Sequence, residues 1–276
     1  MRIAILLTGE YRTFSICRKT MKFLDDPNAD IYFSTWDKTI YSNSLLNMHV
    51  EESVTVEHVL SDLGIPATVI VEPYDLVKKN RWNNSKFLHR VRKGLELIWN
   101  SNKQYDIIMI LRPDLFFHEI SRDLGYDKYK DSLGFAWLNV NETDTLNDQL
   151  FLGSSHAIKK IYDAILVNDW NSSVIGDWHE WWYHFIKGTS SDLIAVDNMH
   201  FIFCRPWATQ TSSYDDIIKI HDDWRDLTFL HQCHIMAHVE NWVPHPVFIG
   251  KYDGIKTKWN NGEYDKYKYP LTTNKE

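Results

Sequence analysis

The chain is poor in cysteine and has no long apolar run. Its three cysteines, Cys17, Cys204 and Cys233, lie far apart and form no Cys-x-x-Cys pair. Neither a disulfide framework nor a structural zinc module is therefore indicated, and a reducing, cytoplasmic setting is expected. The opening apolar run, residues 3–7, is too short for a signal peptide, and no stretch reaches the roughly 18 apolar residues that a membrane-spanning helix needs. We expect a soluble protein with no transmembrane segment.

Basic clusters and glycine-rich fingerprints are missing as well. The formal net charge is -7 at pH 7, and no block of lysine and arginine occurs, which argues against a nucleic-acid partner because binding to a phosphate backbone needs a clustered positive surface. Neither Gly-x-Gly-x-x-Gly nor Gly-x-x-x-x-Gly-Lys-Ser/Thr is present, which argues against nicotinamide or ATP chemistry. A local pocket for a small anion is still compatible with this composition.

One stretch, residues 105–117 (YDIIMILRPDLFF), stands out. Its short, β-branched run at 107–111 is typical of a strand buried on both faces, the central strand of an α/β sheet. Proline has no amide donor, so Pro113 should end the pairing and leave Arg112 and Asp114 at the carboxyl edge, where open α/β sheets bind ligands. An arginine and an aspartate there suit a phosphate and its divalent metal. The alternative is a local ion pair at a strand end.

The order of elements predicts an α/β fold, with one mostly parallel central sheet flanked by helices in a Rossmann-type sandwich. Residues 38–60 are expected to hold a polar loop, with a short helix around 54–63. A charged tail, residues 256–276, should be loosely held. Strands are expected at residues 2–7, 30–36, 68–72, 107–111, 133–138, 146–155 and 196–203, and helices at 14–24, 54–63, 84–98, 156–167, 177–186 and 227–239.

The predicted helix at 84–98 is amphipathic. Phe87, Val91, Leu95 and Ile98 recur at spacings of four, four and three, a stripe that should pack on the sheet. The basic residues between positions 89 and 93 lie off this stripe. Most of them are expected in a solvated basic face, with one or two facing a pyrophosphate at the sheet edge.

Four segments, LLTGEYRTF, DIYFSTWD, YDIIMILRPDLFF and NDQLFLGSS, span about the first 155 residues in a specific order and spacing. Together they resemble the single-domain, nucleotide-sugar-dependent glycosyltransferases called GT-A. More narrowly, they resemble poorly characterised enzymes associated with viral and bacterial surface glycans. The resemblance implies a hexosyl- or deoxyhexosyltransferase that moves a sugar from a nucleotide-diphosphate donor to a glycan acceptor. Residues 1–117 would form the donor half and residues 118–255 the acceptor half of one catalytic domain.

The resemblance also assigns a metal site. GT-A enzymes hold a divalent ion on an Asp-x-Asp triplet at the end of the central strand, and the matching triplet is Arg112-Pro113-Asp114. Asp114 is thus the candidate ligand for Mn²⁺ or Mg²⁺, while Arg112 could neutralise the diphosphate directly. The lost first carboxylate puts strict metal dependence in doubt. His245, between two prolines, is the candidate for the C-terminal histidine that completes the metal shell in several GT-A enzymes.

Residues that follow the predicted strands are the candidates for the remaining roles. Two carboxylates are candidates for the catalytic base: Asp148 first, because it precedes an apolar strand, and Glu180 second, at the start of a helix. Either one could instead be an ordinary carboxylate at a helix N-terminus or in a loop. The donor-site candidates are Thr8, Gly9 and Arg12 after the first strand, with Glu72 and Tyr74 near the base or ribose after the third.

Two other classes of function fit parts of the chain. His231, His234 and His238 fall at i, i+3 and i+7, a spacing that suits a metal hydrolase but also an ordinary semi-buried aromatic helix. The tryptophans at residues 178–182 could instead stack on sugar in a non-catalytic carbohydrate-binding protein.

Overall fold

The computed structural model describes most of the first two hundred residues and a C-terminal helix. The described ranges are 1–43, 48–77, 84–120, 125–136, 138–139, 145–146, 148–167, 178–189, 192–196, 199–203 and 246–263. Contacts divide the chain into two compact units, Met1–Thr39 with Ser53–Phe201, and Ile40–Glu52 with Ile202–Glu276. Each unit is described by itself below. The predicted donor and acceptor halves stay predictions.

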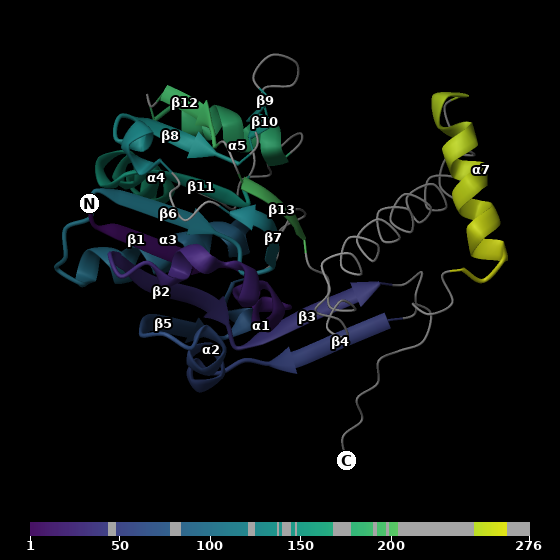
Figure 1. Ribbon diagram of the computed structural model, residues 1–276, viewed down its shortest axis with the longest axis horizontal. Helices are drawn as coiled ribbons and strands as arrows, with labels where there is room; N and C mark the ends of the chain where they lie inside the picture. The colour runs from purple at the N-terminus through teal and green to yellow at the C-terminus, as the bar shows by residue number, and fades with distance from the viewer. Residues whose placement is uncertain are drawn as a thin grey trace. The chain divides into compact units, whose positions relative to one another are not determined.

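A seven-stranded sheet forms the centre of the first unit, in the order β12-β8-β11-β6-β1-β2-β5 (Figure 1). This confirms the predicted α/β fold with a mostly parallel sheet, because only β11 runs antiparallel to its neighbours β6 and β8. The strands in this order are Asp192–Ala195, Ser132–Phe135, Leu150–Ser154, Ile107–Leu111, Ile3–Thr8, Ala29–Trp36 and Ala67–Glu72.

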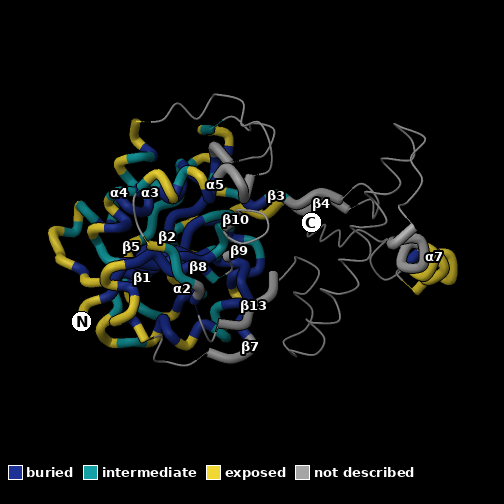
Figure 2. The backbone as a smooth tube through the Cα atoms, turned by 90° about the horizontal axis from the view of Figure 1, so that it is seen from above, coloured by how far each residue is buried: buried dark blue, intermediate teal, exposed yellow. Residues whose placement is uncertain are grey.

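The central position of β6 follows from its sequence. All five of its residues are buried, as are all six of β1, and Figure 2 shows β1 in the colour of buried residues. A strand covered on both faces has no solvent-facing side that would need polar residues, so its pattern is continuous rather than alternating. The predicted central strand is therefore confirmed at residues 107–111.

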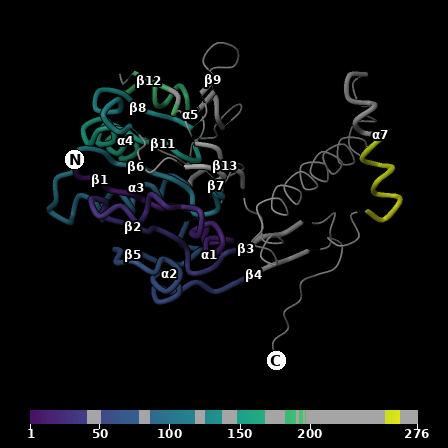
Figure 3. The backbone as a smooth tube through the Cα atoms, in the orientation of Figure 1, coloured from purple at the N-terminus to yellow at the C-terminus, as the bar shows by residue number. Residues whose placement is uncertain are grey.

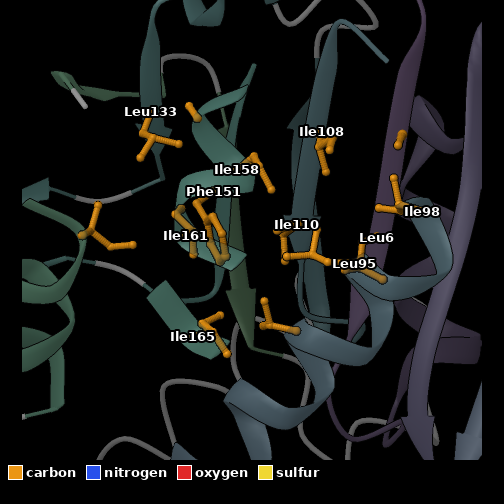
Figure 4. Packing of buried hydrophobic residues seen from close by; sticks show 14 of the residues in the cluster. Leu6, Leu95, Ile98, Ile108, Ile110, Leu133, Phe151, Ile158, Ile161 and Ile165 are labelled. Carbon is orange, nitrogen blue, oxygen red and sulfur yellow. The ribbon is translucent and has the colours of Figure 1, made fainter. Parts of the chain in front are cut away.

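Helices α3 (Asn84–Asn100), α4 (Ser155–Val167) and α5 (Trp178–Lys187) share one apolar core with the sheet. Figure 4 shows Leu95 and Ile98 of α3 beside Leu6 of β1, and Ile158 and Ile161 of α4 on the side of Phe151. Residues Val91, Leu95 and Ile98 of the predicted stripe are fully buried, and Phe87 packs against the same cluster. The stripe prediction is confirmed.

A second aromatic cluster joins the start of the chain to α2 (Val56–Leu63). Tyr11 contacts Phe14, Phe33 and His58 with ring centroids 5.5, 6.1 and 6.0 Å apart. Thr55 caps α2, since its side chain accepts a hydrogen bond from the backbone N–H of His58 at 3.2 Å. The short helix expected around residues 54–63 is therefore present.

The helix expected at residues 14–24 is wrong as a continuous element. The segment instead forms α1 (Phe14–Cys17), followed by two short 3-10 turns at Arg18–Thr20 and Lys22–Asp25. Arg18 donates from Nε to the carbonyl oxygen of Leu63 at the end of α2, 2.9 Å away, and Met21 between the turns is fully buried. Tertiary packing thus overrides a helix-compatible sequence.

Several element boundaries also differ from the predictions. The polar loop expected within 38–60 contains a strand pair, β3 (Lys38–Asn43) and β4 (Met48–Ser53). The strand expected at 133–138 is divided between β8 and β9 (Leu138–Asn139), and the one at 146–155 between β10 (Thr145–Leu146), which pairs with β9, and β11. Residues 196–203 yield the shorter β13 (Met199–Phe203), which pairs with β7 (Leu115–Ile120).

In the second unit, α7 (Pro246–Asn260) includes the first residues of the expected tail, so residues 256–260 are helical. The remaining predicted elements near the C-terminus, the helix at 227–239 and the rest of the tail from residue 264, lie outside the described residues. No helix in the described part of the chain has the length and apolar character to cross a membrane.

Candidate functional site

The order in which the chain adds strands to the sheet changes direction at β1. The chain passes from β1 to β2 and β5 on one side, and then returns through α3 to β6 on the other side of β1, a path that Figure 3 traces. The connections after β1 and after β6 therefore leave in opposite directions at the carboxyl edge. Open α/β sheets bind ligands in the crevice that such a switch point creates. This place was predicted from residues 105–117 alone, and the topology independently indicates it.

The loop after β1 has an unusual backbone. Gly9 has a φ of +132°, a region that side-chain-bearing residues rarely adopt, and a Cβ added there would lie 3.6 Å from Cδ of Pro113. Its N–H donates to the carbonyl oxygen of Ser34 at 3.2 Å, and its carbonyl oxygen accepts from Oγ1 of Thr35 at 2.8 Å. Gly9 therefore lets the loop lie close to both neighbouring strand ends. Arg12, with a φ of +40°, is a non-glycine residue in the left-handed region, a strain typical of functional loops.

Two arginines meet one aspartate at this edge. Nε and Nη2 of Arg112 donate to the two carboxylate oxygens of Asp114 at 2.9 and 2.7 Å. Nη1 of Arg12 donates to Oδ2 of the same carboxylate at 3.0 Å, and Nε of Arg12 donates to Glu10 at 3.0 Å. The arrangement joins the ends of β1 and β6 and holds both guanidinium groups on one carboxylate, a geometry that favours strong, charge-assisted bonds.

The charges of this cluster differ in exposure. The Asp114 side chain is 1% exposed, whereas that of Arg112 is 26% and that of Arg12 is 17% exposed. Burial lowers the pKa of Arg112, but the charges of Asp114, Asp148 and Glu10 outweigh it and raise that pKa above its usual value. The carboxylate is thus covered, while both cations reach the surface of the cluster.

Asp148 lies at the same edge because of the register between β11 and β6. Leu150 is opposite Leu111, and the backbone N–H of Arg112 donates to the carbonyl oxygen of Gln149 at 2.9 Å. Asp148 is therefore next to this hydrogen bond, and its charge acts on Arg112. The structure brings together the first base candidate and the predicted phosphate ligand. The second candidate, Glu180, lies in the first turn of α5.

Thr8 differs from the neighbouring donor candidates. Its side chain is 1% exposed, and within the described ranges its hydroxyl oxygen has no hydrogen-bond partner. It offers no surface to a ligand in this conformation. Gly9 and Arg12 are the candidates after β1 that lie against the cluster.

A second group of charges lies at the carboxyl ends of β2 and β5. Glu72 forms an ion pair with Arg90, and one of its carboxylate oxygens lies within hydrogen-bond distance of Nε2 of His89, 2.9 Å away. Arg90 also donates to the carbonyl oxygen of Thr35 at 2.7 Å. The Arg90 guanidinium lies 4.1 Å above the ring of Trp36. Burial and the charge of Arg92 lower the pKa of Arg90 to about 9, so it remains charged at neutral pH. Arg90 is therefore not part of the solvated face, which was expected for most of these basic residues and not for all of them.

Tyr74, the other candidate in this region, is also buried. It is 3% exposed, its carbonyl oxygen accepts a hydrogen bond from the buried Lys86, and its ring lies against the same ammonium group. Sequence reasoning missed Lys86. The signal that could have indicated it is the pair of aromatic residues Trp36 and Tyr74 at two neighbouring strand ends, because aromatic rings can compensate a buried cation.

The metal site fits the described residues poorly. No group of three or more histidine, cysteine, aspartate or glutamate side chains in the described ranges is placed to hold an ion. Asp114, the predicted ligand, already accepts three hydrogen bonds from two guanidinium groups. His245 and the histidines at 231, 234 and 238 lie outside the described residues, so their metal roles stay predictions.

The tryptophan prediction for carbohydrate binding is wrong at Trp182. This side chain is fully buried and packs against Phe87, Phe151 and Phe185, with ring centroids 5.9, 5.6 and 5.5 Å apart. A ring inside the core has no free face on which a sugar could stack.

No family model and no curated protein matches the chain. Among solved structures, it is similar to HddC from Yersinia pseudotuberculosis, with a TM-score of 0.42, 10% identity, and coverage of 80% of this chain and 100% of that one. It is also similar to a nucleoside-diphosphate-sugar pyrophosphorylase from Vibrio cholerae RC9, with a TM-score of 0.42, 14% identity, and coverage of 79% and 99%. The galactosyltransferase LgtC in complex with donor and acceptor sugar analogs has a TM-score of 0.41, 10% identity, and coverage of 71% and 73%. Likenesses at this level leave the function to be argued from the site.

Proposed function

We propose that the chain is a glycosyltransferase that binds the diphosphate of a nucleotide-sugar donor at the carboxyl ends of β1 and β6. The observation that carries the proposal is the pair of guanidinium groups, Arg12 and Arg112, held on one buried carboxylate at the switch point of the sheet. Guanidinium forks match phosphate oxygens geometrically and stay charged at all relevant pH values. The four sequence segments that resemble GT-A enzymes include this loop and this strand end.

Glycosyl transfer requires little covalent chemistry from the protein. Charge develops on the leaving nucleoside diphosphate as the glycosidic bond breaks, and preorganised cations at that position lower the barrier. Arg12 and Arg112 are assigned this role. An acceptor hydroxyl must also be oriented and, in an inverting enzyme, deprotonated by a carboxylate. Asp148 is assigned as this base because it lies beside Arg112, with Glu180 as the second candidate.

The donor sugar is proposed to be a hexose or deoxyhexose and the acceptor a glycan. Support for this part comes from the sequence resemblance. Glu72, in the group of charges at the carboxyl ends of β2 and β5, and the segment after it lie two strands away from the guanidinium pair, across β2. That separation suits the nucleoside end of a donor whose diphosphate is bound between β1 and β6.

The first experiment is a binding screen followed by a turnover screen. UDP, GDP, CDP, ADP and dTDP are tested by thermal shift, with manganese, magnesium or chelator, because a ligand that binds the folded state raises its melting temperature. The corresponding nucleotide sugars are then tested for nucleotide release and, with oligosaccharide acceptors, for transfer. One nucleotide is expected to raise the melting temperature. No shift with any nucleotide, in any of the three conditions, would contradict the proposed function.

The base assignment has its own test. Asp148→Asn is expected to lower transfer by about 100-fold or more, the usual contribution of a general base, with donor binding retained. The matched control is Asp163→Asn, which changes an exposed aspartate that is paired with Lys159 on α4. Equal activity in the two variants would move the assignment to Glu180.

A further inference from the structure

We infer that Asp114 is a positioning residue that clamps two arginines, and that these arginines, rather than a divalent metal on Asp114, neutralise the donor diphosphate. The inference rests on the proposed function and deepens it. It concerns the same edge of the sheet but assigns the charge compensation to Arg12 and Arg112.

The contacts of Asp114 carry the first step. Oδ1 accepts from Nε of Arg112, and Oδ2 accepts from Nη2 of Arg112 and Nη1 of Arg12, all within 3.0 Å. Divalent cations bind carboxylate oxygens at about 2.0–2.6 Å. A metal ion on Asp114 would therefore lie against two positive guanidinium groups, or it would have to displace them from a carboxylate that is 1% exposed. The donor set at this position does not fit a metal ion.

The same contacts explain how two like charges can lie together. Without the shared carboxylate, the guanidinium groups of Arg12 and Arg112 would repel each other. With it, each is fixed on its inner side by bonds of 2.7–3.0 Å. A guanidinium has five N–H groups, and among the described residues Arg12 uses Nε for Glu10 and Nη1 for Asp114. The N–H groups of its Nη2 take part in neither of these bonds, and guanidinium N–H groups suit phosphate oxygens.

Glu10 and Asp148 change the net charge of the cluster from +1 to -1. Both carboxylates act on Arg112, together with Asp114, so three negative charges face two positive ones. An incoming diphosphate gains direct bonds to the guanidinium groups but is repelled by the carboxylates behind them. The clamp thus gives precise geometry at a cost in affinity. Glu10 accepts a hydrogen bond from Arg12. Removing the negative charge of Glu10 should relieve part of the repulsion between the carboxylates and the diphosphate.

The decisive experiment measures nucleoside diphosphate affinity by calorimetry in EDTA and in manganese. The probe is whichever of UDP, GDP, CDP, ADP and dTDP gives the largest thermal shift. The expected result is a dissociation constant that changes less than about twofold between the two conditions. A loss of about tenfold or more in EDTA, equivalent to about 1.4 kcal/mol, overturns the inference but leaves the proposed function standing. Absence of binding in both conditions overturns both.

Three variants test the clamp directly in EDTA. Arg112→Gln is expected to weaken binding about tenfold or more, and the matched control Arg2→Gln, at the opposite edge where Arg2 pairs with Asp30, is expected to leave it unchanged. Glu10→Gln is expected to tighten binding severalfold. Unchanged affinity in Arg112→Gln, or weaker binding in Glu10→Gln, overturns the inference.

A fold control keeps the result unambiguous. Each variant is melted without nucleotide, and Arg112→Lys is added because it keeps the positive charge but loses the two-point contact with Asp114. Because the two-point contact with Asp114 is lost, Arg112→Lys is expected to keep only part of the nucleotide affinity of the unmodified protein. Full affinity in the lysine variant would show that charge alone acts, with no role for the geometry set by Asp114.

Discussion

Gly94 of α3 allows the helix to approach β1 so closely that a single added methyl group should be costly. A Cβ built on Gly94 would lie 2.5 Å from Cδ2 and 3.0 Å from Cγ of Leu6, and closer still to Cδ1. Carbon atoms pack favourably at about 3.5–4.0 Å, so the overlap is roughly 1 Å. Leu6 is fully buried, and it belongs to the strand that leads into the candidate site.

The size of the effect follows from two opposing terms. Overpacking a closed core costs about 1–3 kcal/mol, while replacing glycine by alanine inside a helix contributes about 0.5–1 kcal/mol of stability. We expect Gly94→Ala to destabilise the protein by about 1–2 kcal/mol. Leu6→Ala alone should cost about 2–5 kcal/mol, because it leaves a cavity.

The double variant Leu6→Ala/Gly94→Ala separates this explanation from others. The three atoms nearest to the added methyl group all belong to the part of the Leu6 side chain that Leu6→Ala removes. The methyl group then occupies space that Leu6 has vacated, so the double variant should be more stable than the sum of the single losses predicts, by about 1 kcal/mol or more.

Urea unfolding, followed by both circular dichroism and tryptophan fluorescence, measures the cycle. The two probes must give coincident transitions before free energies are compared, because the chain contains two units. Gly254→Ala in α7 is the matched control, since nothing lies within 4 Å of its added Cβ, and the helical term alone should stabilise it by about 0.5–1 kcal/mol. Additive losses in the cycle, or a Gly94→Ala variant as stable as the unmodified protein, would refute the reasoning.

Three further predictions concern the carboxyl edge. Arg90→Met should cost about 3 kcal/mol in urea unfolding, because it leaves the partly buried Glu72 with one partner fewer; a loss below about 1 kcal/mol contradicts this. Burial, with the charges of Arg92 and Lys93, lowers the pKa of His89 from 6.5 to about 4. As the pH drops, the unfolded chain therefore binds the proton before the folded chain does. The free energy of unfolding should fall as the pH drops from about 6.5 to about 4. His89→Gln should flatten that slope, whereas a slope of opposite sign would show that the Glu72 carboxylate dominates. Gly9→Ala should cost about 1–3 kcal/mol through its positive φ, and an unchanged melting temperature would contradict this.

The strands β1, β2, β5 and β6 and the helix α3 were predictable because they depend on local patterns. The buried run at 107–111 and the stripe through Val91 and Leu95 each record which faces an element covers, and the structure confirms both. The break in the helix expected at residues 14–24 was not predictable. The interruption at Met21 depends on contacts with the end of α2, to which Arg18 donates a hydrogen bond, and such contacts leave no periodic signal.

In the candidate site, too, some residues were predictable from local patterns and some contacts were not. Arg112 and Asp114 were predictable, because a proline after an apolar run indicates a strand end, and strand ends of parallel sheets share one edge. The partnership of Arg12 with Asp114 was not, since 102 residues separate them and a backbone φ of +40° at Arg12 is needed. Burial of Arg90 also lay beyond the pattern, because its compensating partner Glu72 comes from a different element.

By itself, the sequence determined the class of the fold, the central strand and the edge at which chemistry is expected, because burial on one or both faces imposes a residue pattern on each element. Only the tertiary structure decided which charges meet there. Ion pairs between distant loops are set by sheet order, register and backbone angles, and none of these is local. The sequence resemblance made Asp114 a candidate metal ligand, which stays a prediction, and the structure adds its pairing with two arginines.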